Sequence, residues 1–440
     1  LAVNRLENNY GIPGGAHEHE HEEEEGEEHE GEEHGEEEEE EEGGISLDIE
    51  QTRYDAMLHW HNPIDALDVM SGFLTYTDYE HAEIEGSGEI GTEFSRETWE
   101  GRLEMVHRQI GNFDGVFGLQ AISDEFSAVG EEAYIPQTDS SEVGLFLVED
   151  YHAGDWLFEL GLRYDWVDRD PDVGSSEDFG SFSAAGSALW DVTGGWQLGL
   201  ALSRNERAPA VEELYSNAGN EGPDEWVEHA ATAAIELGDT ALDTETSNNA
   251  DFSIRWAGEG HWADFTVFYN DFADYINLSS TGIEVGETPV LVYSQEDAEF
   301  YGVEFDSEFT LASFGGGDLL AGIWGDYLRG ELDSGDDVPR LPPMRLGARL
   351  AWATDNFELW TRVLDADEQD KPGANQEATD GYTKWDIGAD YRLATASGDL
   401  NLFIAFNNVT DEEIRLSTSF LRDVAPEAGF SVEAGVRWMF

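Results

Sequence analysis

The sequence predicts an all-β protein, a transmembrane antiparallel β-barrel of about 18 strands. Segments of about ten residues alternate apolar and polar side chains, aromatic residues mark the ends of such segments, and the gaps between them have two lengths. No apolar run reaches the roughly 18 residues that a membrane-spanning helix needs. A barrel leaves little hydropathy signal because only every second side chain faces lipid, so the polar composition agrees with this fold.

The clearest segment is WLFELGLRYDW at residues 156–166. Side chains of a strand alternate between two faces, so one face of this segment carries Trp156, Phe158, Leu160, Leu162, Tyr164 and Trp166. The other face is mostly polar. A strand of a soluble sandwich also alternates, but an apolar face that begins and ends in aromatic residues is typical of a strand that crosses a bilayer.

The same alternation recurs at 263–269, 385–393 and 400–406, and each segment is followed by turn-forming residues. The chain ends in GFSVEAGVRWMF, whose apolar face terminates at Phe440. A last strand of this kind resembles the signal for barrel assembly in the outer membrane. It places Phe440 on the periplasmic side and the longer gaps on the outside.

The gaps between expected strands alternate in length along the chain. The shorter gaps lie near 60–67, 108–114, 152–155, 191–196, 256–262, 312–318, 353–357 and 394–399. The longer gaps lie near 11–43, 82–92, 130–140, 168–179, 206–246, 280–290, 330–341, 366–380 and 410–429. Outer-membrane barrels have short periplasmic turns and long external loops, whereas a soluble sandwich has no reason to sort its loops in this way.

The formal net charge is −77, from 98 acidic and 21 basic residues. Because Lys and Arg supply affinity for phosphate, this balance argues against nucleic-acid binding. It suits a cationic partner or a surface that attracts divalent cations. Cys is absent, so disulfides and thiolate metal sites do not contribute.

Residues 17–42 contain eighteen Glu, five His, three Gly and no other residue type, within an expected external loop at 11–43. Same-sign charge and Gly prevent a packed core, so this tract is expected to lack regular structure. A solubilising loop needs Glu but gains nothing from imidazole, which is a favoured zinc ligand. The tract is therefore expected to capture metal through His17, His19, His21, His29 and His34. Copper or nickel would bind the same ligands.

Four stretches, in this order along the chain, resemble the TonB-dependent outer-membrane receptors. They are SRNERAPAVEELYS at 203–216, AEFYGVEFD at 298–306, VPRLPPMRLGARL at 338–350 and FNNVTDEE at 406–413. The resemblance implies a cell outer-membrane protein of a Gram-negative bacterium, surrounded by lipid and acting as a monomer. It also implies a transporter with the TonB complex as partner.

Receptors of this family have 22 strands around an N-terminal plug. About 18 of an expected 22 strands are present here, and Leu1 lies within an expected strand. Residues 1–440 are therefore expected to be a C-terminal barrel domain, truncated at its N-terminus, whose upstream part carries the plug and the TonB-contacting segment. The wall is expected to be open or poorly closed between its first and last strands.

Four further stretches resemble the zinc-uptake branch of that family. They are RLENNYGIPG followed by the His/acid tract, YTDYEHAEIEG at 76–86, the region 213–249 and FLRDVAPEAGFSV at 420–432. This likeness implies Zn²⁺ as the transported ligand, no catalytic cofactor, and a discrete metal site near His81, Glu83 and His229, close to Asp78 and Glu80. The stretch AGNEGPDEWVEHAAT at 218–232 is longer than the corresponding stretch of that branch, which leaves the equivalence of His229 open.

Other functions are possible for the same fold. A receptor for an iron–siderophore or haem complex is the main alternative, although such sites tend to be lined by aromatic residues and Arg. Without a plug, the barrel alone could form a passive pore. An enzyme is not expected, because neither His81 nor His229 lies in a recognisable nucleophile context.

Overall fold

The computed structural model describes residues 1–11, 45–130, 132–220, 222–229, 232–374, 376–395 and 397–439. These residues form twenty strands and one helix of five residues, and none of their helices is long and apolar enough to cross a membrane. The elements are β1 (Ala2–Gly11), β2 (Ser46–His61), β3 (Leu67–Ile84), β4 (Ile90–His107), β5 (Phe113–Gly130), β6 (Thr138–Ala153), β7 (Trp156–Pro171), β8 (Glu177–Thr193), β9 (Trp196–Arg207), α1 (Val211–Tyr215), β10 (Glu228–His229), β11 (Ala234–Leu237), β12 (Glu245–Gly258), β13 (His261–Val285), β14 (Thr288–Phe314), β15 (Gly317–Leu332), β16 (Arg345–Ala353), β17 (Phe357–Ala366), β18 (Tyr382–Thr395), β19 (Gly398–Asn407) and β20 (Ser431–Met439).

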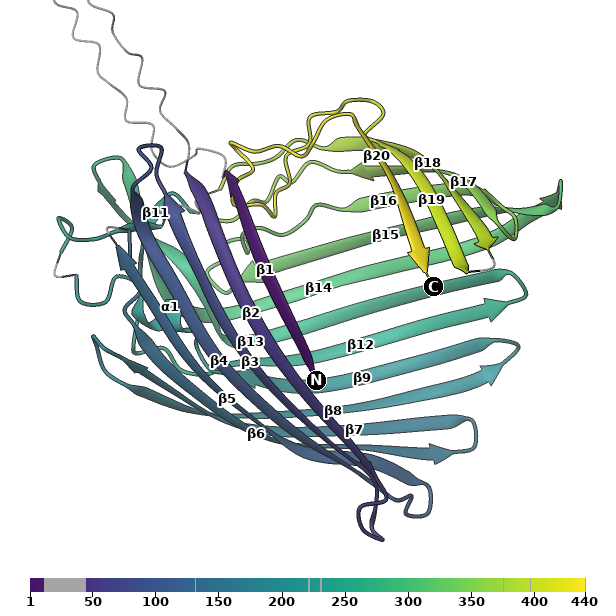
Figure 1. The fold of residues 1–440 in the computed structure, drawn as a ribbon, viewed down its shortest axis with the longest axis horizontal. Helices are drawn as coiled ribbons and strands as arrows, with labels where there is room; N and C mark the ends of the chain where they lie inside the picture. Colours follow the sequence, from purple (N-terminus) through teal and green to yellow (C-terminus); the bar gives the residue numbers. More distant parts are fainter. Residues whose placement is uncertain are drawn as a thin grey trace, which may run out of the picture.

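The strands β1 to β9 and β12 to β20 form one antiparallel meander, in which β12 pairs directly with β9. The prediction of about 18 strands in the wall is therefore confirmed. Within the described residues no pairing joins β1 to β20, and Figure 1 shows these two strands at the edges of the curved wall. This agrees with the expected opening between the first and last strands.

The strand β7 bears its apolar face outward, as the alternation predicts. Of its six outward residues, all but Leu162 are exposed, up to 50% for Trp166. In a monomeric soluble protein so continuous an apolar surface would be unusual, but a bilayer covers it. Trp156 stacks on Trp190 of β8 with ring centroids 5.2 Å apart, which marks the aromatic band near the short turns.

The two classes of connection are mostly as predicted. The short turns 62–66, 108–112, 154–155, 194–195, 259–260, 315–316 and 354–356 coincide with the predicted shorter gaps. The long external gap predicted near 280–290 is wrong, because β13 and β14 continue through it as a hairpin. A register shift between Ser280 and Ile283 accommodates Gly282, which has a φ of 69°, so the glycine does not end the strand.

The external connections are packed against one another. Leu214, Tyr215, Leu242 and Ile276 form a buried cluster under the connection between β9 and β12. The fully buried Tyr215 donates a hydrogen bond from its hydroxyl to the Ser175 carbonyl oxygen, 3.0 Å away. The interior of a barrel is usually polar, so this apolar core above the membrane gives the external mouth a defined shape.

Candidate functional site

Alternation along β3 separates the acidic and His residues at its external end. Tyr54, Tyr76 and Trp99 form an outward aromatic band, with Tyr76 and Trp99 centroids 4.6 Å apart. Asp78 and Glu80 share the parity of Tyr76 and lie on the same outward face. His81 and Glu83 lie on the inner face, beyond the aromatic band and therefore outside the membrane. The cluster at 78–83 is thus divided between the two faces.

His81 lies against aromatic rings. Its ring stacks on Phe94 with a centroid distance of 4.4 Å and meets Tyr79 edge-on at 5.5 Å. Its Nδ1 is buried without a hydrogen-bond partner among the described residues. Burial lowers the pKa of His81, so the ring is neutral near pH 7, which is the form that binds metals.

Glu83 lies beside a second carboxyl group, Glu132, in the connection between β5 and β6. Burial and the hydrogen-bonded Glu132 raise the pKa of Glu83 to about 7, while the nearby His229 acts in the opposite direction. Two carboxyl groups in contact cannot both ionise at low cost, so the pair tends to retain one proton. The structure thus brings Glu83 within electrostatic range of His229, although the two residues are 146 positions apart in the sequence.

His229 is held by a buried carboxylate. Its Nδ1 lies 3.0 Å from Glu236 Oε1, and Glu236 is only 2% exposed. Burial alone would raise the pKa of Glu236, but hydrogen bonds from His229, Thr232 (2.7 Å) and Tyr293 (2.9 Å) hold it below its usual value. Glu236 is therefore an ionised acceptor, so Nδ1 carries the hydrogen. A metal-binding His is commonly oriented in this way by a carboxylate on its other ring nitrogen.

Packing fixes the plane of the His229 ring. The ring stacks on Tyr134, with centroids 4.7 Å apart. Burial, and then the charge of Glu236, raise the pKa of Tyr134, so its hydroxyl stays protonated. One face of the ring lies on Tyr134 and Nδ1 is bound to Glu236, while Nε2 has no hydrogen-bond partner among the residues that the structure describes.

Asn217 joins the segments that carry these residues. Its backbone N–H donates to the Tyr134 carbonyl oxygen at 2.6 Å. Its side chain donates to the carbonyl oxygens of Val227 (2.9 Å) and Glu236 (2.8 Å) and accepts from the Val227 N–H at 2.8 Å. Asn217 has a φ of 56°, a conformation that Asn tolerates better than most residues. One buried residue therefore links the segments of β10 and β11 through its side chain and Tyr134 through its backbone N–H.

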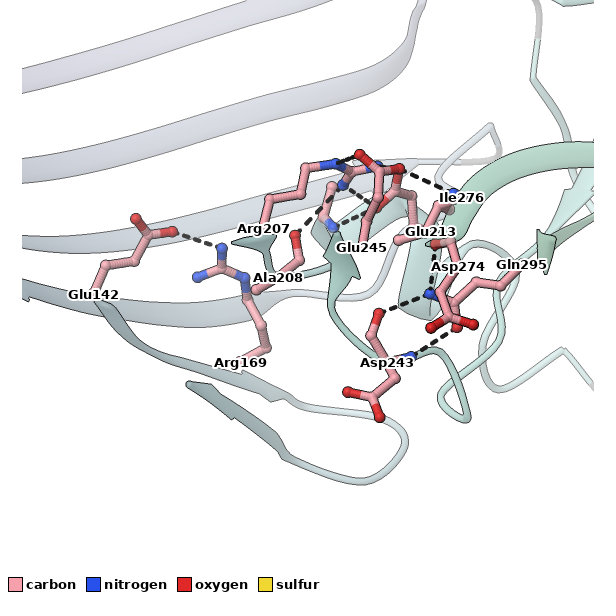
Figure 2. Close-up of polar contacts among 11 residues, drawn as sticks. Glu142, Arg169, Arg207, Ala208, Glu213, Asp243, Glu245, Asp274, Ile276 and Gln295 are labelled. Atoms are coloured by element: carbon pink, nitrogen blue, oxygen red, sulfur yellow. Dashed lines mark hydrogen bonds and ion pairs between the residues drawn. The ribbon is translucent and has the colours of Figure 1, made fainter. Parts of the chain in front are cut away.

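The base of the same connection is fixed by the ion pairs in Figure 2. Arg207, at the end of β9, donates to both oxygens of Glu213 in α1 (2.8 and 3.0 Å) and to both oxygens of Glu245 in β12 (3.1 Å each). Glu245 also accepts the Ile276 N–H at 3.0 Å. Above this network, β11 pairs in parallel with β14 through Ile235, Glu236 and Leu237, which places Glu236 next to Tyr293.

Within the described ranges no three His, Cys, Asp or Glu side chains are placed to hold a metal ion together. His17, His19, His21, His29 and His34 lie outside the described residues. Of the three residues expected at the mouth, Glu83 lies within electrostatic range of His229, whereas the ring contacts of His81 are with Phe94 and Tyr79. The three therefore remain a predicted metal site.

Sequence reasoning missed four members of this cluster, namely Glu132, Tyr134, Glu236 and Tyr293. Glu236 had a signal, because it is the one charged residue of the otherwise apolar stretch TAAIEL and a buried charge there needs partners. Glu132 and Tyr134 come from the connection between β5 and β6 and Tyr293 comes from β14, and none of the three carries a local signal.

Comparison with known proteins gives the family. Residues 41–409 match the family model described as "TonB dependent receptor-like, beta-barrel". The chain belongs to the TonB-dependent receptor β-barrel family. Family membership confirms the resemblance found in the four sequence stretches, and such barrels lie in the outer membrane of Gram-negative bacteria. Proteins of this family are not enzymes, and neither is this chain.

Several solved structures share the fold of this TonB-dependent receptor barrel. One is the copper transporter OprC, with 17% identity, a TM-score of 0.73, and coverage of 89% of this chain and 66% of that one. The FrpB iron transporter from Neisseria meningitidis has 14% identity, a TM-score of 0.67, and coverage of 89% and 63%. The Serratia marcescens hemophore receptor HasR, solved with its hemophore HasA and heme, has 17% identity, a TM-score of 0.67, and coverage of 90% and 66%. The chain thus spans slightly less than two thirds of each of these proteins.

Proposed function

We propose that this chain is the barrel of a TonB-dependent transporter that imports zinc across the outer membrane. The proposal rests on the orientation of His229, whose Nδ1 lies 3.0 Å from Oε1 of the buried Glu236, with Glu83 within electrostatic range of the ring. Neutral imidazole and carboxylate are ligands that Zn²⁺ prefers, and a carboxylate on the second ring nitrogen makes His a stronger ligand. The TonB complex, reached through the part of the receptor that precedes the barrel, would supply the energy.

The barrel residues supply only part of a zinc coordination shell. His229 and Glu83 would give two ligands, and a tetrahedral site needs four. His81, which shares the inner face of β3 with Glu83, is a candidate for a third. The remaining ligands would come from another part of the receptor, which is consistent with the absence of a complete metal cluster among the residues that the structure describes.

The His/Glu tract would have a different task. A polyanionic loop concentrates divalent cations through its field, an effect screened over about 8 Å at physiological salt. Flexible Glu accepts Ca²⁺ and Mg²⁺ as well as zinc, so the tract collects ions and the site at the mouth selects among them. His17, His19, His21, His29 and His34 would add affinity for transition metals.

Copper, and an iron–siderophore or haem complex, are the competing substrates. Structural neighbours include a copper transporter, an iron transporter, a ferric enterobactin receptor and a hemophore receptor. The acidic exterior and the His–carboxylate pair favour a metal cation over a large aromatic complex. We favour zinc over copper as the substrate because four sequence stretches resemble the zinc-uptake branch of the family.

Uptake of radioactive zinc by cells that express the full-length protein tests the proposal. A double variant, with His229→Ala and Glu83→Gln, is expected to reduce zinc uptake even when zinc is plentiful. Deleting residues 17–42 is expected to reduce uptake mainly when zinc is scarce and salt is low. The zinc assignment fails if the double variant takes up zinc normally, or if an iron–siderophore is imported and zinc is not.

A further inference from the structure

Glu149 places a carboxyl group on the lipid-facing side of the barrel, near the short turns. It pairs in register with Leu160 of β7 and therefore shares the outward face of that strand. Its outward neighbours along β6 are Leu147 and Tyr151. The Tyr151 ring packs against Phe113 of β5, with centroids 4.7 Å apart, and so continues the aromatic band. A charge on the lipid face of a barrel costs stability, so Glu149 needs partners.

The Glu149 side chain crosses the neighbouring strand to reach His107. Gly115 of β5 lies directly opposite Glu149 and leaves the necessary space, because a Cβ atom there would lie 2.6 Å from Glu149 Cδ. Beyond this glycine, Glu149 Oε1 lies 3.0 Å from Nε2 of His107, the last residue of β4. The side chains are 24% exposed for Glu149 and 12% for His107. The position is therefore shaped for a carboxyl group, which any side chain at 115 would displace.

The hydrogen bonds of His107 decide what this pair offers to a ligand. Its Nδ1 lies 2.8 Å from the Arg108 carbonyl oxygen, which can only accept, so Nδ1 carries a hydrogen. A second hydrogen lies between Nε2 and Glu149, so the pair is an imidazolium with a carboxylate or a neutral ring with a carboxylic acid. In both forms the imidazole has no free donor. Glu149 Oε2 has no hydrogen-bond partner among the described residues, so the pair presents an acceptor to the lipid.

We propose that Glu149, beside the rings of Phe113 and Tyr151, binds the ammonium group of an ethanolamine phospholipid in the periplasmic leaflet. Aromatic residues at the ends of barrel strands lie at the level of the lipid headgroups, so the carboxyl group meets headgroups there. An acceptor next to aromatic rings suits a cation that donates hydrogen bonds. The primary ammonium of ethanolamine has three N–H donors, whereas choline has none and a glycerol headgroup has no cation. This inference does not depend on the substrate that the receptor transports.

Native mass spectrometry of the full-length receptor in detergent tests this site. The probes are three phospholipids with identical acyl chains, whose headgroups are ethanolamine, choline and glycerol. The unmodified receptor is expected to bind the ethanolamine lipid about tenfold more tightly than the other two, as for one or two hydrogen bonds to a charged group. Glu149→Gln keeps the shape but replaces the carboxyl group by a neutral amide, so this preference should be lost. Glu159→Gln is the matched control, because Glu159 pairs with Asp150 on the interior face of the same two strands.

His107→Gln separates a lipid site from a pair that only joins two strands. Gln can still donate a hydrogen bond to Glu149, so the carboxyl group stays in place and the preference for ethanolamine is expected to persist. Equal loss of the preference in His107→Gln and Glu149→Gln would overturn the proposal, because the pair would then have a structural role alone. The site is also refuted if the unmodified receptor binds the three lipids equally, if Glu149→Gln keeps the preference, or if Glu159→Gln loses it.

Discussion

His229 Nδ1 and Glu236 Oε1 are 3.0 Å apart, and the carboxylate of this pair is almost completely buried. The contact joins β10 to β11 and fixes which nitrogen of His229 carries the hydrogen. It also connects His229 to Tyr293 of the barrel wall, because the second oxygen of Glu236 accepts a hydrogen bond from the Tyr293 hydroxyl.

Replacing Glu236 by Gln is expected to weaken zinc binding to the full-length receptor by about 10- to 100-fold, because the amide no longer fixes the His229 tautomer. Calorimetry with zinc chloride gives the affinity. Thr232→Val, which removes one bond to Glu236 but leaves the pair with His229 intact, is the control and should have a smaller effect. Unchanged affinity in Glu236→Gln would show that His229 does not bind the metal.

Zinc affinity is expected to increase as the pH rises through about 7, because Glu83 loses its proton in this range. Zinc titrations between pH 5.5 and 8.5, about 1.5 units on either side of this pKa, measure the effect. Glu132→Gln removes a neighbouring charge, so the pKa of Glu83 falls and the transition moves to lower pH. Glu83→Gln should abolish the transition. A pH profile that is identical in all three proteins would exclude Glu83 as a ligand.

The same pKa has a consequence for stability. The folded protein holds a proton on Glu83 that the unfolded chain, with an ordinary value of 4.5, has lost by pH 7. The contribution of Glu83 to stability is therefore greatest below pH 4.5 and decreases as the pH rises from 4.5 to about 7. Glu83→Gln should remove this decrease in stability with rising pH. Residues 132–137 of the variant should then exchange their amide hydrogens more slowly at pH 8 than those of the unmodified protein.

Asn217→Ala is expected to destabilise the external connection 208–244 locally by about 3 kcal/mol, since it leaves buried backbone groups without partners and puts Ala at positive φ. Hydrogen exchange at the Val227 amide, which donates to the Asn217 side chain, reports the opening. Asn217→Gly tolerates the backbone and loses only the side-chain bonds, so it should be intermediate. Equal exchange in all three proteins would show that Asn217 does not hold the connection.

Leu160→Arg on the outward face of β7 is expected to destabilise the barrel in lipid vesicles by about 2–4 kcal/mol, as for other cations near the middle of a bilayer. Urea unfolding gives the free energy. Ser187→Arg is the control, since Ser187 faces the interior and donates a hydrogen bond to Glu159. If both variants are equally stable, this face of β7 does not contact lipid.

Much of the fold was predictable because its determinants are local. Alternation is a property of neighbouring residues in a strand, so residues 156–166 predict both the strand and its outward face. Turn-forming residues predict the seven short turns for the same reason. The prediction of a longer gap near 280–290 failed, because pairing between β13 and β14 continues through this region and absorbs Gly282 as a bulge.

The candidate site was predictable only in part. The sequence by itself determined that Glu83 and His229 belong to the external end of the barrel, since strand parity and loop length decide the side of the membrane. Only the tertiary structure decided that Glu83 contacts Glu132 and that Glu236 rather than His81 accompanies His229. The physical reason is that the Glu83–Glu132 contact joins different connections of the barrel, and the His229–Glu236 contact lies in segments held by one buried side chain, Asn217. No local period or spacing encodes either contact.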